Sequence, residues 1–363
     1  MSQRIKRKCR SALSVLPLFC AVVSLASCSV AGLEKFALEN KLEASSSAYD
    51  ESAVANAQSK RQDKSDFLQF DSFITGGKQA DTGRLGVFKR LLVGPADDVQ
   101  FIRPVAVGGI DSYLYIVDAG AQAIFRYDLI NQLVEPVGEV GPQFVGEPGN
   151  IFVARDRSFY IVDELGKQVI QFNEQGDVLQ VFKDPANLSR PIDVIVDELT
   201  GNVLVADASF SHIVVFNPFG KSIKAIGRRG SGEGRFRAIT AITIGLEGLY
   251  VVDRLELPVQ VVSMNGEFKY SFGESYHVFP TAIAVNQDRQ VFVADQSDNT
   301  IRVYRDAVLL GTVGGTGAGP GRFRKVTSMW VSDDKLYLAD SLNRRVQVMR
   351  ILPDTSRPAA LTL

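Results

Sequence analysis

Side chains able to do chemistry are few in this chain of 363 residues, and their positions exclude several kinds of site. All three cysteines, Cys9, Cys20 and Cys28, lie in the first 28 residues. The rest of the chain therefore lacks the residues for a disulfide, a Cys-ligated zinc or iron–sulfur site, or a thiol nucleophile. The sequence has no Gly-x-Ser-x-Gly motif of serine hydrolases, and neither of its glycine-rich segments, 230–237 and 317–324, is followed by the Lys-Ser/Thr that completes a phosphate-binding loop.

The chain has two histidines, His212 and His277, and they are the candidates for metal binding through imidazole. A zinc site built on two histidines needs further ligands, such as carboxylates. With such carboxylates at a channel mouth, the pair would support a metal-dependent lyase or hydrolase, which is the alternative enzymatic interpretation. The pattern favours ordinary loop positions, so we expect no catalytic residue, no metal and no cofactor.

The strongest pattern in the sequence is a short apolar strand that ends in aspartate and occurs six times. An aliphatic residue follows six positions after each aspartate and opens a second apolar run. The spacing is about 45 residues, and the aspartates are Asp118, Asp163, Asp207, Asp253, Asp295 and Asp340.

Each repeat unit reads as four short antiparallel strands. A further strand precedes the one that ends in aspartate, and in four units it is opened by a proline: Pro104, Pro148, Pro191 or Pro280. A four-stranded sheet cannot bury both of its faces alone, so the units must pack radially. The sequence therefore predicts an all-β fold, a six-bladed β-propeller over residues 67–354, followed by a tail over 355–363.

Closure of the ring requires one more strand, because the sixth unit has three. We expect residues 85–93 (LGVFKRLLV) to supply it, so that an N-terminal strand removes the open sheet edge. Residues 67–75 (FLQFDSFIT) either add an outer strand or pack on the rim, and the sequence does not decide between these.

The repeat pattern resembles the NHL repeat over residues 84–350. The segments Gly230–Arg237 (GSGEGRFR) and Gly317–Arg324 (GAGPGRFR) look like the glycine-rich link that begins an NHL blade. The resemblance implies a six-bladed NHL-like propeller. The NHL-like amidating lyases bind metal through several histidines from different blades, and a chain with two histidines departs from that pattern.

In such a propeller, the loops after the second strands and the links between blades leave from the same face. The six aspartates therefore share that face with the links, and we expect each carboxylate to accept nearby backbone amides and fix a loop. The link arginines either lie along the neighbouring blade and pair with a strand-end aspartate, or bind an anionic ligand at the channel mouth. These arginines are Arg103, Arg190, Arg235, Arg237, Arg322 and Arg324.

The N-terminus has the features of a bacterial lipoprotein signal. Residues 1–27 combine a basic start with an uncharged, mostly apolar stretch too short for a stable membrane span. Leu25-Ala26-Ser27-Cys28 resembles a lipobox, which implies lipidation of Cys28 and attachment to a membrane surface. Residues 28–66 carry that lipidated N-terminus and read as a polar, flexible tether.

Composition and charge agree with a folded, globular head. The chain is 45% hydrophobic and 22% charged, which is not the usage of a disordered or multi-span membrane protein. The formal net charge is -1, and removal of residues 1–27 with their five basic residues leaves 35 basic against 41 acidic residues, or -6. This balance excludes a protein that binds nucleic acid through bulk positive charge.

Taken together, the sequence predicts a lipid-anchored cell-envelope propeller that binds an envelope protein or an anionic glycan without chemistry of its own. If the host is Gram-negative, Ser29 after Cys28 implies sorting to the outer membrane. An obligate structural subunit of an envelope assembly is a further alternative. The oligomeric state is not predicted.

Overall fold

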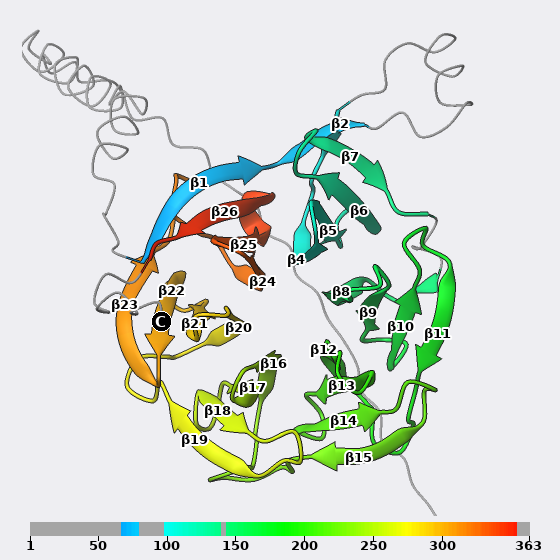
Figure 1. Cartoon of the computed structure of the whole chain (residues 1–363), viewed down its shortest axis with the longest axis vertical. Coiled ribbons are helices and arrows are strands. Elements are labelled where there is room, and N and C mark those ends of the chain that lie inside the picture. Colours follow the sequence, from blue (N-terminus) through cyan, green and yellow to red (C-terminus); the bar gives the residue numbers. More distant parts are fainter. Residues whose placement is uncertain (1–66, 80–97, 139–142, 354–363) are drawn as a thin grey trace, which may run out of the picture. The chain divides into compact units, whose positions relative to one another are not determined.

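The repeated apolar runs form β-strands, and the strands form six sheets around a central axis (Figure 1). The computed structural model describes residues 67–79, 98–138 and 143–353, which belong to one compact unit. The predicted signal peptide, tether, 85–93 strand and C-terminal tail lie outside the described residues. Within the described part of the chain, no helix is long and apolar enough to cross a membrane.

Each sheet is one blade, and its strands are named a to d from the axis outward. The strands of blade 1 are β4 (Pro104–Ile110), β5 (Tyr113–Asp118), β6 (Ala123–Asp128) and β7 (Leu133–Pro136). Blade 2 contains β8 (Pro148–Val153), β9 (Phe159–Asp163), β10 (Gln168–Phe172) and β11 (Val178–Phe182). Blade 3 contains β12 (Pro191–Asp197), β13 (Asn202–Asp207), β14 (His212–Phe216) and β15 (Ser222–Ile226).

The second half of the ring repeats this order. Blade 4 contains β16 (Ile239–Gly245), β17 (Gly248–Asp253), β18 (Val259–Val262) and β19 (Phe268–Phe272). Blade 5 contains β20 (Pro280–Val285), β21 (Gln290–Asp295), β22 (Thr300–Arg305) and β23 (Val308–Gly314). Blade 6 combines β24 (Val326–Ser332), β25 (Lys335–Asp340) and β26 (Arg345–Ile351) with the N-terminal β1 (Leu68–Ile74), and a 3-10 turn (Ser341–Asn343) follows β25.

The six-bladed propeller predicted from the sequence is confirmed. Strand a of blades 1, 2, 3 and 5 begins at the expected proline, and strand b of every blade ends in the repeated aspartate. The innermost strands contact one another around the whole ring, including β24 with β4.

The hydrophobic core lies between neighbouring blades. Six clusters of buried side chains each combine residues of two adjacent blades, so every sheet buries both of its faces. The b strands are the most completely buried, as in β9, where all five residues are inaccessible. Radial packing therefore supplies the burial that a single sheet lacks.

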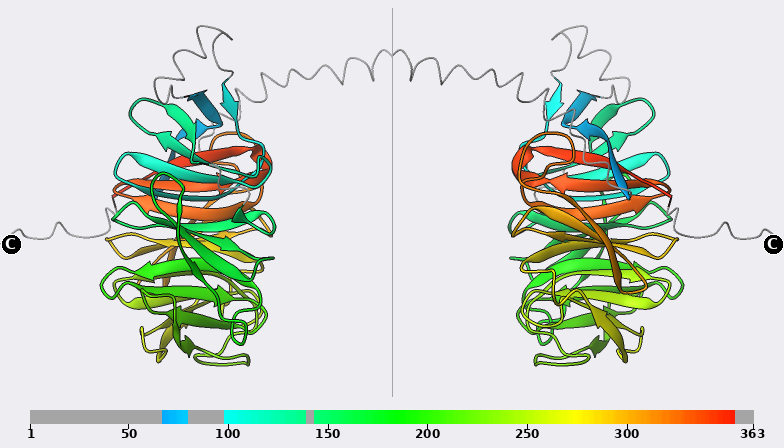
Figure 2. Two further views of the ribbon diagram at one scale, coloured as in Figure 1. Left: turned by 90° about the vertical axis from the view of Figure 1, so that its right-hand side faces the viewer. Right: turned by 90° about the vertical axis from the view of Figure 1, so that its left-hand side faces the viewer.

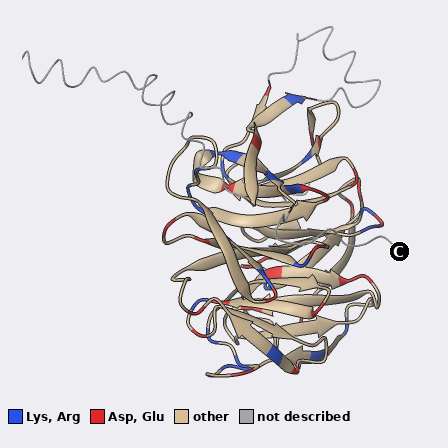
Figure 3. Ribbon diagram, turned by 60° about the vertical axis from the view of Figure 1, so that its left-hand side comes forward, with Lys and Arg blue, Asp and Glu red and all other residues tan. Residues whose placement is uncertain are grey.

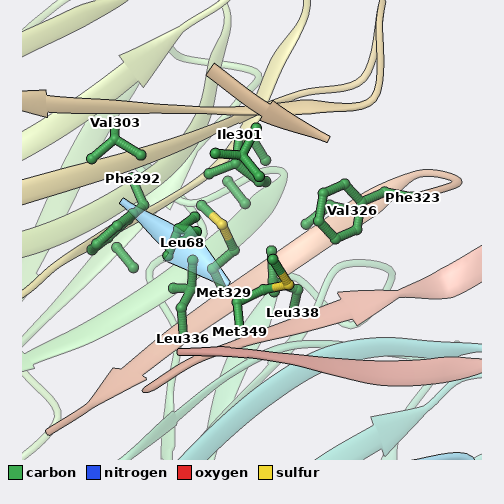
Figure 4. Close-up of a cluster of buried hydrophobic side chains, with 14 of the residues drawn as sticks. Leu68, Phe292, Ile301, Val303, Phe323, Val326, Met329, Leu336, Leu338 and Met349 are labelled. Carbon is green, nitrogen blue, oxygen red and sulfur yellow. The ribbon is translucent and has the colours of Figure 1, made fainter. Parts of the chain in front are cut away.

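The ring is closed by β1, which corrects the prediction that residues 85–93 close it. β1 pairs antiparallel with β26, with Leu68 opposite Ile351 and Ile74 opposite Val346. The two strands lie side by side in Figures 1 and 2, β1 in blue and β26 in red. Leu68 is buried in the cluster between blades 5 and 6 (Figure 4). Residues 67–75 and 85–93 have similar apolar patterns. The local sequence does not encode which of them pairs with a strand about 280 residues away.

The chain continues from β1 to the outer edge of blade 1. There β2 (Gly76–Gln79) pairs in parallel with β7 and antiparallel with β3 (Val99–Gln100). The pairing of the c and d strands shifts register in blades 2 to 6, whereas the β6–β7 pairing of blade 1 is regular. Bulges distort an edge strand and discourage pairing with other chains. Blade 1 has its edge covered by β2 instead.

The two ends of the blades form two faces. The link face carries the links between blades and the loops after the b strands, and the turn face carries the remaining turns. Strand β26 starts at the link face, so its partner β1 begins at the turn face, where the Leu352 amide bonds the Phe67 carbonyl at 2.8 Å. The chain that precedes residue 67 therefore joins the propeller at the turn face.

Candidate functional site

The six repeated aspartates are buried at the link face and bind backbone amides. Asp118 accepts bonds from the amides of Ile102 and Arg103 in the preceding link, at 2.7 and 2.8 Å. It also accepts bonds from Gly120 and Ala121 in the following loop, at 2.9 and 3.0 Å. The other five carboxylates likewise accept link amides, and four of them also accept amides of the following loop. Each carboxylate thus fastens a link to its blade and has little remaining capacity for a ligand.

All six link arginines lie on the link face, and three of them face acids there. Arg103 pairs with Glu147 at 2.6 Å and Arg190 with Glu164 at 2.8 Å, while Arg237 lies 3.9 Å from Glu256. Arg322 donates to the Gly314 carbonyl at 2.7 Å. Arg235 and Arg324 are exposed. Three of the six arginines therefore face acids of the same face, and the other three lie in the links into blades 4 and 6. Figure 3 shows charges of both signs on the ribbon.

The two histidines lie on different blades and are engaged in different contacts. His212 is on β14, with Nε2 at 2.7 Å from the Asn187 carbonyl oxygen. The buried His277 side chain lies 2.8 Å from the Tyr304 hydroxyl and 3.4 Å from Asp295. Burial and the nearby Arg302 lower the pKa of His277 to about 4. Among the described residues, no three His, Cys, Asp or Glu side chains are grouped to hold a metal ion.

A group of polar residues inside the central channel was not predicted from the sequence. The channel contains a cavity of about 120 Å³ lined by the a strands of all six blades, including the half-buried Trp330. The third residue of the a strand lines this cavity in blades 2 to 6. This position is Ala in three blades but polar in the other three: Asn150, Asp193 and Ser328.

Asp193 connects three blades through hydrogen bonds. Its carboxylate accepts the Asn150 amide of blade 2 at 2.6 Å, its neighbour Val194 at 2.9 Å, and the Ile242 amide of blade 4 at 2.8 Å. Complete burial raises the pKa of Asp193 to about 7, and these hydrogen bonds offset part of that rise. It is the ionisable residue among those that line the cavity.

Threonines fasten other blades at the same depth. The second residue of the a strand is bulged, which lets Thr240, Thr281 and Thr327 reach carbonyls of the next blade at 3.0, 2.9 and 2.7 Å. Comparing the second and third positions of the a strands across the repeats would have revealed these residues, because they break the pattern that the other blades follow. These polar residues of the channel therefore hold neighbouring blades together. The link face is the candidate binding surface.

The link face also displays apolar side chains. Exposed large apolar residues on the turn face are Ile130, Leu199, Phe219, Leu246 and Val308. Those on the link face are more numerous and occur at every blade: Ile102, Val145, Leu165, Phe210, Leu255, Tyr276, Val278 and Leu342. Arg254 stacks on Phe279 between two of them, with its guanidinium carbon 4.6 Å from the ring centre. Arginine and aromatic side chains, such as Phe210 and Tyr276 on this face, are enriched where proteins bind other proteins.

Comparison with known proteins shows the fold. No protein-family model and no curated protein matches the chain. A virginiamycin B lyase from Staphylococcus aureus is 11% identical with a TM-score of 0.52, over 68% of this chain and 94% of that one. A streptogramin B lyase is 9% identical with a TM-score of 0.54, over 78% and 98%. A protein of unknown function from Bacteroides thetaiotaomicron is 13% identical with a TM-score of 0.56, over 78% and 76%. At these identities the likeness concerns the propeller fold and not the activity.

Proposed function

We propose that this chain is a lipid-anchored cell-envelope propeller of NHL-like repeats that binds a partner through its link face and has no catalytic activity. The observation that carries the proposal is the ring of exposed apolar residues and arginines on that face. The partner is an envelope protein or an anionic glycan.

The point at which the chain enters the propeller supports the same assignment. The segment before residue 67, which the sequence predicts to be the tether, joins at the turn face. A tether attached at the turn face does not cover the link face at its point of attachment. The rigid ring and the buried aspartates hold the link loops in fixed positions, which reduces the entropy lost on binding.

The lyase or hydrolase alternative has no residue-level support at the link face. A divalent ion bound by His212 and His277 would need both side chains at one point. His212 instead contacts the Asn187 carbonyl, His277 is buried against Tyr304 and Asp295, and the described residues contain no group of three His, Cys, Asp or Glu that could hold a metal ion. The obligate-subunit alternative predicts a partner that never dissociates, which purification in mild detergent distinguishes from reversible binding.

Membrane attachment is tested by replacing Cys28. We expect the Cys28→Ser variant to incorporate no fatty-acid analogue during metabolic labelling and to appear in the soluble fraction, since no cysteine follows position 28. The wild-type chain grown in parallel is the control. Label retained by Cys28→Ser would refute lipid anchoring at this residue.

Binding is tested with matched substitutions on the two faces. Leu165→Asp and Val278→Asp place a negative charge on the link face at residues that are 69% and 72% exposed. Leu246→Asp and Val308→Asp do the same on the turn face, at residues that are 75% and 62% exposed. We expect the first pair to reduce recovery of the co-purifying partner at least tenfold, because a buried charge in an interface costs more than 1.4 kcal/mol. The second pair should match the wild type, and all four should keep its melting temperature. Equal loss from both faces would contradict the proposal.

A further inference from the structure

The links into blades 4 and 6 are the same structure built twice. Each spans twelve residues, Gly227–Ala238 and Gly314–Lys325, and we call them the twin loops. In both, one buried phenylalanine, Phe236 or Phe323, packs beneath the loop and forms a parallel bridge with the segment seven residues before it. The amide of each phenylalanine bonds a carbonyl eight residues earlier, at 3.0 and 2.9 Å.

A buried glutamine holds each loop in place. Gln260 on β18 accepts the Gly234 amide at 2.9 Å and donates to the Arg235 carbonyl at 2.7 Å. Gln347 on β26 accepts the Gly321 amide at 2.7 Å and donates to the Arg322 carbonyl at 3.0 Å. The other four blades have Phe, Ile, Val or Arg at this position, so the glutamine occurs where a twin loop occurs. The loops are therefore pre-organised and not merely glycine-rich coils.

Both twin loops are strongly cationic. The first has Arg228, Arg229, Arg235 and Arg237 against Glu233, a formal charge of +3. The second has Arg322, Arg324 and Lys325 and no acid, again +3, in a chain whose mature net charge is -6. All of these basic residues are exposed. A side chain added at Gly232, Gly319 or Gly321 would meet open space, so the loops project from the link face.

Apolar side chains lie in the link between the twin loops. This link, into blade 5, exposes Tyr276 and Val278, and the neighbouring loop of blade 4 exposes Leu255. Two cationic loops around an apolar centre suit a ligand that has both carboxylates and apolar groups. A polypeptide segment that combines acidic and apolar residues has both, whereas a polyuronate glycan has carboxylates and hydroxyls but no apolar side chains.

We propose that the twin loops form a paired receptor for an acidic polypeptide segment, whose carboxylates bind the loop arginines and whose apolar side chains cover Tyr276 and Val278. This inference rests on the proposed binding role of the link face. Arginine binds carboxylates through two parallel hydrogen bonds, and fixed loops lose little freedom on binding.

The test measures binding of labelled polymers to the full chain by fluorescence anisotropy. The probes are a copolymer of glutamate and tyrosine, polyglutamate of equal charge, and alginate as a polyuronate. We expect the copolymer to bind most tightly, polyglutamate more weakly and alginate weakest, with all affinities falling between 50 and 200 mM salt, by analogy with other charge-driven complexes.

Matched variants assign the binding to the loops. Arg228→Gln with Arg229→Gln removes two charges from the first loop, and Arg324→Gln with Lys325→Gln removes two from the second. We expect each pair of substitutions to weaken binding of the copolymer about tenfold, and all four substitutions together to abolish it. The control, Arg155→Gln with Lys221→Gln, removes two exposed charges from the turn face and should have no effect.

Three results would overturn the inference: alginate binding as tightly as the copolymer, no probe binding at 50 mM salt, or unchanged binding by the fourfold variant. If the fourfold variant keeps the natural partner while Leu165→Asp loses it, the link face still binds a partner and the receptor assigned to the twin loops is wrong.

Discussion

Deletion of residues 68–74 is expected to abolish cooperative folding of the propeller. The deletion removes β1, exposes the edge of β26 and empties the positions of the buried Leu68 and Ile74. Two buried aliphatic side chains and several backbone hydrogen bonds together contribute about 8 kcal/mol, a large part of a typical domain's stability. Thermal unfolding followed by circular dichroism measures the effect.

Two deletions in the same chain serve as controls. Residues 84–94 contain the strand predicted from the sequence to close the ring. Their removal should leave the β1–β26 pairing and the melting temperature of the propeller unchanged. Removal of residues 34–60, the predicted tether, should also leave the transition unchanged. A larger loss of stability from the 84–94 deletion than from the 68–74 deletion would show that β1 is not the closing strand.

Replacement of Asp193 by Asn is expected to change how stability depends on pH. The pKa of Asp193 is about 7 in the fold and near 3.9 in an unfolded chain. Between pH 4 and 7 the folded chain therefore holds the extra proton, and this group lowers the free energy of unfolding as pH rises, by up to about 4 kcal/mol.

His277 acts in the opposite direction over the same range. Its pKa is about 4 in the fold against 6.5 unfolded, so the unfolded chain holds the extra proton. This group raises the free energy of unfolding as pH rises from 4 to 6.5, by up to about 3 kcal/mol. In the wild type the two contributions largely cancel.

The Asp193→Asn variant retains only the His277 contribution of this pair. As pH rises from 4.5 to 8, the free energy of unfolding of the variant should therefore increase relative to that of the wild type by several kcal/mol. Urea titrations at pH 4.5, 6 and 8 measure the difference, in which all other titrating groups cancel. Parallel pH profiles for the two proteins would show that Asp193 is not a buried, titrating carboxylate.

The sequence predicts the parts of this molecule that repeat. Six aspartates at a 45-residue period define the blades, and their place at the ends of the b strands identifies the link face. The closing strand could not be predicted, because β1 and residues 85–93 have similar apolar patterns and the choice depends on long-range pairing and packing. The arginines could be assigned to a face but not to partners, since the pairing of Arg103 with Glu147 joins two different links.

Residues that depart from the repeat were the ones missed. Asn150, Asp193 and Ser328 occupy a position that is alanine in the other blades, and Gln260 and Gln347 mark the blades that carry twin loops. Their roles depend on contacts across blades, which a period in one sequence does not reveal. Aligning the six units by their aspartates and reading each column for exceptions would have found both sets.

Site-specific photo-cross-linking in cells shows whether the link face binds a partner. A photoreactive amino acid is placed at Leu255 or Leu342 on the link face, and at Leu199 or Leu246 on the turn face, all of which are exposed. We expect a discrete cross-linked species from the first two positions and none from the last two. Cross-links confined to the turn face, or equally strong from both faces, would contradict it.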